Sequence, residues 1–453
     1  MMDPTASRIV LSVVDRARRL LGSLFLTAQV AACAVPRAEM SGGLDAARTA
    51  WLRRNAHPVA LRAAGFDDLR FLVPLLREKR IVQLGENAHG IREYNLVKAR
   101  LVRFLHEVMD FDVLVFESDL YLCHVADRRA AEARAVSTLT GCAVGVWHTQ
   151  EVLPLFEYLR ATRAGPDPLW LAGMDIQPIG RHKEGRPPFL SRVVAPFDTA
   201  YAASVLRLDS TFLAVYGQGA RARRAYFRSA NGRWMAESYD SLGRFLAERK
   251  AARSARDATP STERGIARQT ARSMAWYIRQ QAAPTMRDYV ERRDQGMAEN
   301  LAFIVDELFP GRKVIVWGHN FHLRHNNLAI PADTATFPNV AARTMGTWTR
   351  ARYGDALYTV GLYAYQGAAA DNGGHVYSIA PAPAGSLEWM LSHAGPDALF
   401  IDLSRAAETD ATAWMRRPIS ARYNGTVPLA MIVRDQYDAV LFVRDARPRR
   451  MLY

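Results

Sequence analysis

Short apolar segments that alternate with longer helical patterns constrain the fold of this chain most strongly. Six of them are rich in β-branched or aromatic residues and bounded by Gly, Asp, Asn or Glu: Ile81–Leu84, Val113–Phe116, Leu169–Ala172, Val314–Trp317, Leu357–Val360 and Ala398–Ile401. Segments of this kind are typical of strands that are buried on both faces of a sheet. The sequence therefore predicts a buried sheet at the core of the protein.

The stretch between the first two predicted strands indicates how they are connected. Its apolar residues form a single helical stripe: Tyr94, Val97, Leu101, Leu105 and Val108. A strand, a crossover helix and a second strand make a βαβ unit, whose two strands run parallel. We therefore expect an α/β fold with a mainly parallel sheet and flanking helices.

The strand pattern stops over residues 187–307. Long, arginine-rich amphipathic stretches take its place there: Ser238–Arg253 and Glu263–Gln281. A turn within this region is predicted at Asp257–Thr262. We expect one α/β domain over residues 45–450, with this region as a helical insertion, or cap, over a cleft at the carboxyl ends of the strands.

Residues 1–33 have the order of a bacterial signal peptide. Three arginines within residues 16–19 precede an uncharged apolar run over residues 20–32, which is too short to span a bilayer as a stable helix. The small residues before Cys33 resemble a lipobox, in which that cysteine becomes lipidated. We expect a protein of the periplasm or cell envelope, attached to the membrane through Cys33. A cytoplasmic protein that begins with an amphipathic helix is the alternative.

Charge and cysteine content argue against several classes of protein. The net charge of +14 arises from 59 basic and 45 acidic residues. The arginines are scattered among acids, so we expect no nucleic-acid partner. Three cysteines without a CxxC pair exclude a disulfide scaffold and argue against a zinc module. Cys123 and Cys142 could pair in an exported protein, and the sequence leaves this open.

Acidic and histidine residues follow four of the predicted strands, at the edge where a parallel sheet binds ligands. They are Glu86 and His89 after the first strand, Glu117 after the second, Asp175 after the third, and His319 and His322 after the fourth. Burying six such groups in one crevice is costly without a use for them. We therefore expect a catalytic site at this edge of the sheet.

Several standard mechanisms lack their motifs in this chain. There is no Gly-x-Ser-x-Gly elbow, no GxxxxGK[ST] loop, no GxGxxG after a strand and no HExxH. This argues against serine hydrolases of the α/β type, nucleotide cofactors and zincins. Histidine with carboxylates remains, and it suits either general-base activation of water or a metal site. We expect no cofactor, and a metal-dependent hydrolase that uses the same residues is the alternative.

The motifs around these residues resemble the erythromycin esterase family. Leu84-Gly-Glu-Asn-Ala-His-Gly90 followed by Glu93 resembles the LGExxHG…E signature of that family, and Val115-Phe-Glu117 resembles its second acidic strand end. Further matching segments follow in the same order: Trp147–Glu151 with Leu159-Arg160, Gly173–Asp175, Arg293–Asn300 and Trp317–His322. The resemblance covers about residues 80–325.

The resemblance implies an α/β core closed by a helical portion, and hydrolysis of an ester without a covalent serine intermediate. It implies His89 as the general base, with a set of further catalytic residues: Glu86, Glu117, His319 and His322. It also implies a set of substrate-binding residues: Lys98, Glu93, Trp147, Asp175, Arg293 and Asn320. Lys98 stands where the family often has arginine, so this chain keeps the charge but loses the bidentate fork.

We therefore predict a hydrolase of a small-molecule carboxylic ester or lactone, macrolide-like or an unknown natural ester, that acts as a monomer. His89 takes a proton from water, and the water attacks the carbonyl carbon. A histidine or Lys98 then stabilises the oxyanion or protonates the departing alkoxide. The departure at Lys98 and the export signal argue against macrolide resistance as the role. A non-catalytic accessory protein of the cell envelope, related to polysaccharide biosynthesis, is the alternative of another class.

Overall fold

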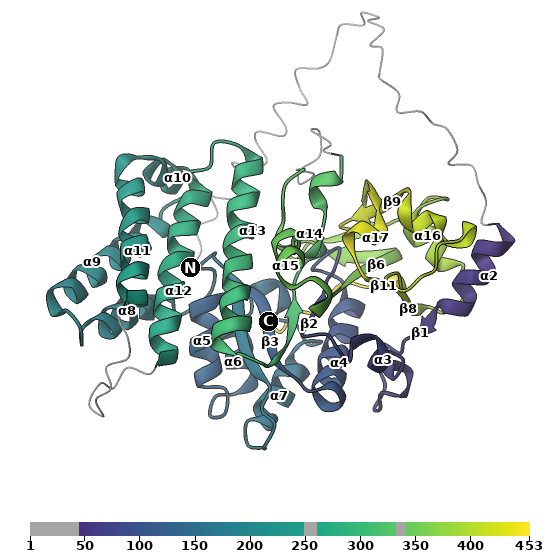
Figure 1. The fold of residues 1–453 in the computed structure, drawn as a ribbon, viewed down its shortest axis with the longest axis horizontal. Helices are drawn as coiled ribbons and strands as arrows, with labels where there is room; N and C mark the ends of the chain where they lie inside the picture. The colour runs from purple at the N-terminus through teal and green to yellow at the C-terminus, as the bar shows by residue number, and fades with distance from the viewer. Residues whose placement is uncertain (1–44, 249–260, 332–340) are drawn as a thin grey trace, which may run out of the picture. The chain divides into compact units, whose positions relative to one another are not determined.

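The structure is a computed structural model that describes residues 45–248, 261–331 and 341–453 (Figure 1). The predicted signal segment with Cys33 lies outside the described residues. The turn predicted at Asp257–Thr262 also lies outside them, except for its last two residues, which begin helix α12 (Ser261–Gln281). All described residues belong to one unit of the chain, Gly43–Tyr453.

Nine strands of the described chain form one sheet, in the order β1-β8-β11-β6-β2-β5-β3-β4, with β7 paired to β6. They are β1 His57–Pro58, β2 Ile81–Leu84, β3 Phe111–Asp119, β4 Trp170–Asp175, β5 Lys313–Trp317, β6 Leu357–Ala370, β7 Val376–Ile379, β8 Ala398–Asp402 and β11 Ala439–Ala446. The strands from β11 to β4 run parallel, whereas β1, β7 and β8 pair antiparallel. The prediction of an α/β fold with a mainly parallel sheet is confirmed. Each predicted strand segment lies in a strand, apart from Leu169, which precedes β4.

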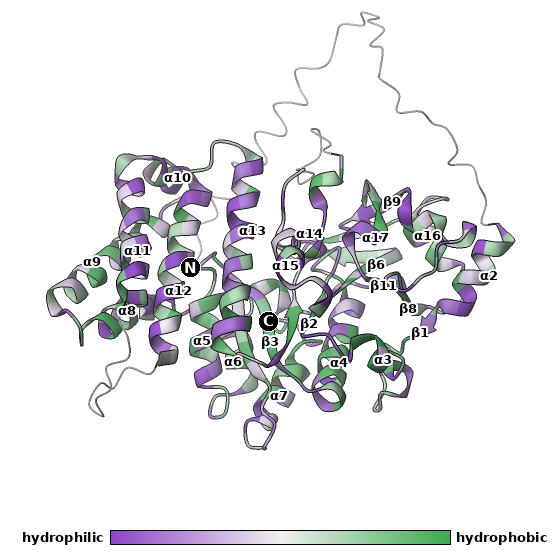
Figure 2. Cartoon of the chain, in the orientation of Figure 1, coloured by the Kyte–Doolittle hydropathy of each residue, from purple (hydrophilic) through white to green (hydrophobic). Residues whose placement is uncertain are grey.

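Both faces of the sheet are buried, as strand β3 shows. Leu114 and Phe116 pack on one face, against helices that flank the sheet, and Val113 and Val115 pack on the other, in a cluster shared with the helical insertion. Burial on both faces explains why the strands read as continuous apolar runs. Figure 2 shows this pattern, with hydrophobic strands at the centre and alternating hydrophilic and hydrophobic stretches along the helices.

Four helices before β4 cover the face of the sheet that holds Leu114 and Phe116: α3 Leu72–Leu76, α4 Arg92–Met109, α6 Ala135–Cys142 and α7 Leu153–Thr162. Helix α5 Leu120–Arg128 contributes to the clusters on both faces, and α2 Ala46–Asn55 packs through Leu52 on the opposite face of β8 and β11. Helix α4 is the predicted crossover between β2 and β3, and its stripe is buried except at Val108, which is 38% exposed. The stripe therefore ends one turn earlier than predicted. A disulfide joins Cys123 of α5 to Cys142 of α6.

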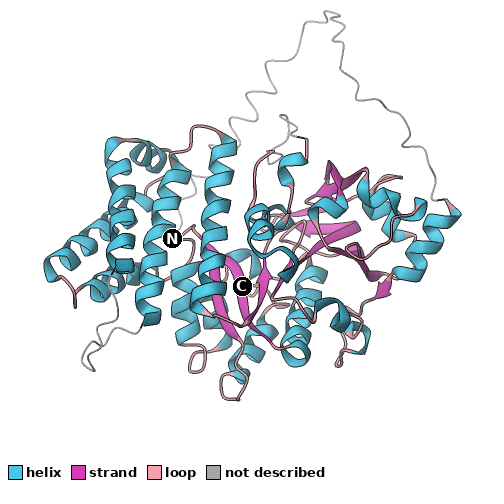
Figure 3. Cartoon of the chain, viewed as in Figure 1, coloured by secondary structure: helices cyan, strands magenta, loops and turns pink. Residues whose placement is uncertain are grey.

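The helical insertion lies between β4 and β5, and Figure 3 shows its helices gathered beside the strands. Its helices are α8 Arg186–Val194, α9 Thr199–Tyr216, α10 Ala220–Arg228, α11 Ala230–Glu248, α12 and α13 Met286–Phe303. A buried ion pair links α8 to α9, because Nη2 of Arg186 donates to Asp209 at 2.9 Å. Tyr239 of α11 donates to the same carboxylate. Helix α13 of this insertion lies next to the ends of β3 and β4, where Arg293 pairs with Glu117 and Asp175.

The chain after β5 completes the rim of the sheet. It contributes helices α14 Asn320–Leu323, α15 Met345–Tyr353, α16 Leu387–Ser392 and α17 Val433–Gln436, and a separate hairpin of β9 Pro418–Tyr423 and β10 Val427–Ile432. In the described part of the chain, no helix combines the length and the apolar character that a membrane crossing requires.

Candidate active site

A cavity of about 760 Å³ opens at the carboxyl ends of the parallel strands. The loops after β2 and β5, the ends of β3 and β4, helix α13, the β6–β7 turn and strand β9 all contribute to its walls. Several of the predicted site residues line it: His89, Glu117, Trp147, Asp175, Arg293, His319 and His322. Residues from widely separated parts of the sequence therefore meet at the predicted edge.

Glu86 is fully buried behind His89 and joins it to two other predicted residues. Its Oε1 lies 2.7 Å from Nδ1 of His89 and accepts from the indole N–H of Trp147 at 3.0 Å. Its Oε2 accepts from Nζ of Lys98 at 2.8 Å. Burial alone would raise the pKa of Glu86, but Lys98 and His89 outweigh burial and lower that pKa. An ionised carboxylate only accepts, so Nδ1 of His89 carries a proton.

Lys98 reaches from α4 into this buried cluster and does not line the cavity. Its Nζ lies 4.3 Å from the ring centre of Trp317. Burial lowers the pKa of Lys98 to about 8, although the neighbouring Glu86 opposes this shift. The structure thus corrects the prediction that Lys98 meets the substrate or its oxyanion, because the ammonium group acts on Glu86 instead.

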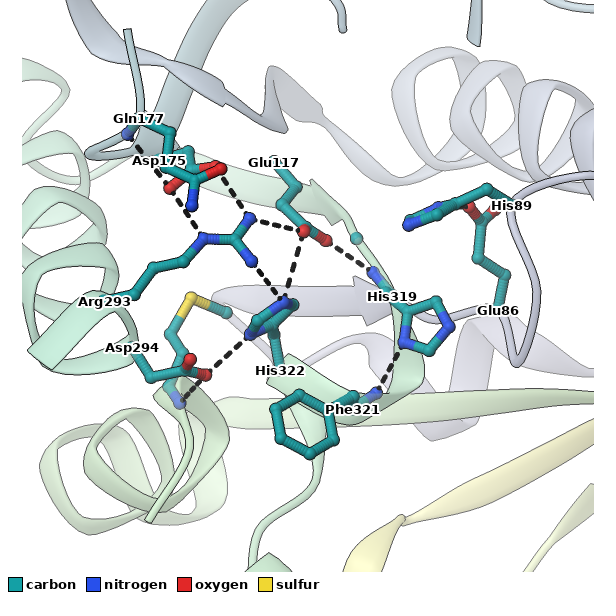
Figure 4. Close-up of polar contacts among 12 residues, drawn as sticks. Glu86, His89, Glu117, Asp175, Gln177, Arg293, Asp294, His319, Phe321 and His322 are labelled. Atoms are coloured by element: carbon teal, nitrogen blue, oxygen red, sulfur yellow. Dashed lines mark hydrogen bonds and ion pairs between the residues drawn. The ribbon is translucent and has the colours of Figure 1, made fainter. Parts of the chain in front are cut away.

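Arg293 of α13 ties together the carboxylates at the ends of β3 and β4. Its Nε and Nη2 donate to Asp175 at 3.1 and 2.7 Å, and Nη2 also donates to Glu117 at 3.0 Å. Burial would raise the pKa of Glu117, but His322 and Arg293 hold it well below its ordinary value. The Glu117 carboxylate is therefore charged, and Figure 4 shows it at the centre of this network.

His322 lies between two carboxylates and Arg293. Its Nδ1 is 2.8 Å from Oδ1 of Asp294, and its Nε2 is 3.0 Å from Nη1 of Arg293 and 3.3 Å from Oε1 of Glu117. A guanidinium only donates and a carboxylate only accepts, so Nε2 pairs with Arg293 in the neutral ring and with Glu117 in the charged ring. Burial would lower the pKa of His322, but Asp294 and Glu117 raise it. The two carboxylates thus favour the charged ring, whose Nε2 donates to Glu117.

His319 lies beside His89, with the two ring centres 4.9 Å apart. Its Nδ1 accepts from the backbone N–H of Phe321 at 3.1 Å, so the proton of the neutral ring is on Nε2. Burial and the neighbouring His89 hold the pKa of His319 well below its ordinary value. His319 is thus a neutral ring with one N–H donor, and Figure 4 shows it between the His89–Glu86 pair and the Arg293 network.

Two predicted substrate-binding residues are used inside the fold instead. Glu93 accepts from the backbone N–H of Arg447 at 2.8 Å. Asn320 pairs with the backbone of Leu362, donating at 3.0 Å and accepting at 3.3 Å. Neither residue lines the cavity. The prediction that Glu93 and Asn320 bind substrate is therefore corrected, since both hold the scaffold around the site.

Several residues of the cavity were missed by the sequence reasoning. Asp294, the partner of His322, follows Arg293 within a matching motif, so a signal for it was present. The other missed residues are aromatic or acidic: Tyr289, Phe321, Asp371, Tyr377 and Tyr423. Those after β6 come from hairpins without a motif, and only the folded structure brings them to the cavity.

Among the described residues, no group of three or more His, Cys, Asp or Glu side chains is arranged to hold a metal ion. The Arg293 guanidinium stands between Glu117 and Asp175 and donates to both. A cation thus already fills the position where these carboxylates would hold a metal.

Comparisons with known proteins agree with these features. The family model described as erythromycin esterase matches residues 106–446. YbfO of Bacillus subtilis (strain 168), provisionally named a hydrolase, is 30% identical over 415 residues, which are 88% of this chain and 91% of YbfO.

Two solved structures share the fold at low sequence identity. A succinoglycan biosynthesis protein has 18% identity and a TM-score of 0.72, over 89% of this chain and 98% of its own. A mutant of the erythromycin esterase EreC, in its open conformation, has 18% identity and a TM-score of 0.66, over 87% of this chain and 98% of its own. The fold is therefore shared over nearly the whole of each protein.

Proposed function

We propose that this chain, which belongs to the erythromycin esterase family and is a hydrolase, cleaves a carboxylic ester or lactone with water that His89 activates. The observation that carries the proposal is the 2.7 Å contact between Nδ1 of His89 and the buried carboxylate of Glu86. This contact keeps one proton on Nδ1 and leaves Nε2 to accept another. A base that is oriented by a third group is the usual arrangement for activating a nucleophile.

Proton transfer from water requires that Nε2 of His89 is free and faces the substrate. His89 lines the cavity, and within the described residues no group is hydrogen-bonded to its Nε2. As the water oxygen bonds to the carbonyl carbon, a water proton moves to Nε2, and Glu86 stabilises the imidazolium that forms. The imidazolium then returns the proton to the departing alkoxide. The products are a carboxylic acid and an alcohol, or a hydroxy acid from a lactone.

The carbonyl oxygen gains negative charge during this attack, and His319 supplies a donor for it under this proposal. Its neutral ring carries the proton on Nε2, beside His89. The backbone N–H of His319 donates to Glu117 at 2.8 Å, so the residue is held at both its backbone and its ring. A donor that is already in place stabilises an oxyanion without reorganisation, which is typically the largest single contribution to such reactions.

The cavity walls support a bulky, partly apolar substrate. Aromatic side chains line them: Trp147, Tyr289, Phe321, Tyr377 and Tyr423. A cavity of about 760 Å³ is in the range that binds molecules of drug size. We therefore propose a lactone or aryl ester rather than a short acyl ester. A non-catalytic accessory role would leave the charged, buried Glu86 behind His89 without a use, so we favour the enzyme.

Hydrolysis in water enriched in oxygen-18 tests the proposal. Purified protein is screened on lactones and aryl esters, with and without chelator, and the acid product of a single turnover is analysed by mass spectrometry. We expect label in the acid and no burst of alcohol release, since no acyl-enzyme forms. Label that enters an enzyme carboxylate instead, or a stoichiometric burst, contradicts direct attack by water. Failure to hydrolyse any substrate in the screen favours the accessory role.

A further inference from the structure

We infer that residues 447–453, which we call the strap, hold three loops of the cavity in register for catalysis, with Arg449 as the central positioning residue. The three loops carry His89, Trp147 and Asp371. The strap follows β11 and contacts each loop through hydrogen bonds. This inference rests on the proposed function, because it explains how the base of that reaction is kept in place.

The first contact is with the loop that follows His89. The backbone N–H of Arg449 donates to the carbonyl of Gly90 at 3.0 Å, and the N–H of Arg92 donates to the carbonyl of Arg447 at 2.8 Å. The Glu93 carboxylate accepts from the N–H of Arg447 at 2.8 Å. The strap thus adds a short antiparallel pairing next to the proposed base, and Glu93 of the family signature anchors it.

The second contact is with the loop that follows Trp147, whose indole donates to Glu86. The backbone N–H of Gln150 donates to the carbonyl of Arg450 at 2.8 Å. The Glu151 carboxylate accepts from the backbone N–H and from Nε of Arg450, at 3.2 and 2.9 Å. Glu151 belongs to another motif that the hydrolysis itself does not use. Its carboxylate, like that of Glu93, pairs with the strap instead.

The third contact is made by the guanidinium of Arg449. Its Nη2 donates to the carbonyl of Asp371 at 2.7 Å and its Nη1 to that of Ala370 at 3.3 Å, at the β6–β7 turn. The N–H of Ala370 in turn donates to the carbonyl of Gly90 at 3.2 Å. A Cβ on Gly90 would lie 1.7 Å from the Ala370 oxygen, so only glycine permits this approach. The turn and the His89 loop are thereby locked together.

Arg449 is only 6% exposed, and its side chain donates to backbone carbonyls rather than to a carboxylate. Burying a guanidinium is costly unless its donors are satisfied, so these loops must keep their carbonyls in place around it. Displacing a catalytic group by about 1 Å costs on the order of 100-fold in rate. The strap should therefore affect turnover more than substrate binding.

The test compares Arg449→Met with Arg444→Met. Arg444 is the control, because it precedes the strap and also donates to backbone carbonyls, those of Ser392 and Gly395, away from the cavity. It differs from Arg449 in that its Nε also donates to the Asp397 carboxylate. Hydrogen exchange of the Arg92 and Ala370 amides is measured together with kcat and KM, well below the melting temperature. If the Met variant does not fold, Arg449→Lys is measured in its place, because it keeps the charge and one donor site.

We expect Arg449→Met to lower kcat by about tenfold to 100-fold with KM within about threefold, and to speed exchange at both amides. Arg449→Lys should recover part of kcat, and Arg444→Met should change neither kcat nor exchange at these sites. A kcat within twofold of the parent, or unchanged exchange in both Arg449 variants, overturns the inference. If the parent protein hydrolyses no ester, the proposed function fails, and the exchange comparison alone decides whether the strap orders the loops.

Discussion

Lys98 controls the charge next to Glu86 in a way that arginine would not. Its Nζ donates to Oε2 of Glu86, and burial lowers the pKa of Lys98 to about 8. Below this pH the ammonium form pairs with the buried carboxylate. Above this pH the amine is neutral, and Glu86 loses the cation that pairs with it. The hydrogen bond between Glu86 and His89 therefore weakens as the pH rises.

We therefore expect kcat to fall on the alkaline side with an apparent pKa near 8. In Lys98→Arg this limb should move above about pH 10, because a guanidinium keeps its proton there. The measurement is a pH–rate profile from about pH 6 to 11. Lys79→Arg is the matched control, since Nζ of Lys79 contacts the Asp355 carbonyl and does not line the cavity. An alkaline limb that stays in place in Lys98→Arg contradicts this role.

The rim residues of the site could be predicted because chain order and sheet type together place them at one edge. Residues at the carboxyl ends of parallel strands, such as Glu117 and Asp175, must meet there. The spacing of residues along the chain does not show how deeply each side chain is buried below the cavity surface. Lys98 and Asn320 lie near the same edge but point into the scaffold, and only their contacts with Glu86 and with β6 decide this.

Helices α5 and α6 illustrate a constraint that acts at the level of whole elements. Cys123 and Cys142, 19 residues apart, are joined by a disulfide. The chain leaves α6 towards Val144 and Trp147, which line the cavity. The bond therefore fixes the start of a loop that contributes to the site, and it answers the question that the sequence left open.

Reduction of this disulfide should lower the free energy of unfolding by about 3 kcal/mol, the scale for a closed loop of this length. Urea denaturation with and without dithiothreitol measures the change. The double variant Cys123→Ala/Cys142→Ala should be less stable than the parent and indifferent to reductant. Equal midpoints for the parent in both conditions would show that these cysteines are not bonded in solution.

Strand β11 was not among the predicted strands, although its apolar run, Ala439–Val443, is as clear as theirs. What the sequence could not show is where this strand lies in the sheet. It pairs parallel with β6 and antiparallel with β8, so its position depends on two partners distant in the chain. The strap follows directly from β11, which is why Glu93 and Glu151 could be recognised as motif residues but not given their roles.

The molecule as a whole carries a net charge of +14, but this charge is not concentrated in the cavity. Acids prevail in the described cavity lining: Glu117, Asp175, Asp294 and Asp371, against Arg293. Many of the other arginines form ion pairs between helices, such as Arg279 with Asp240 and Arg272 with Glu299. The basic composition thus serves the surface and the packing of the insertion.

We propose that the mature protein works in the periplasm or cell envelope. The disulfide supports this location, because such bonds persist mainly in oxidising compartments. A reporter fused after residues 1–40 should reach the envelope of a bacterial host, and Cys33→Ser should abolish lipid labelling. A reporter that stays in the cytosol would contradict export and would favour an intracellular role for the protein.

The turnover number of His89→Ala tests the central claim most directly. His393→Ala is the matched control, because His393 is exposed and donates to a helix carbonyl outside the cavity. If His89 activates water, its removal lowers kcat by about 10²–10⁴-fold, the usual scale for losing a general base, while stability changes little. His393→Ala should keep the parental kcat. A His89→Ala enzyme with activity within about threefold of the parent would contradict the mechanism, because that loss is far smaller than a general base contributes.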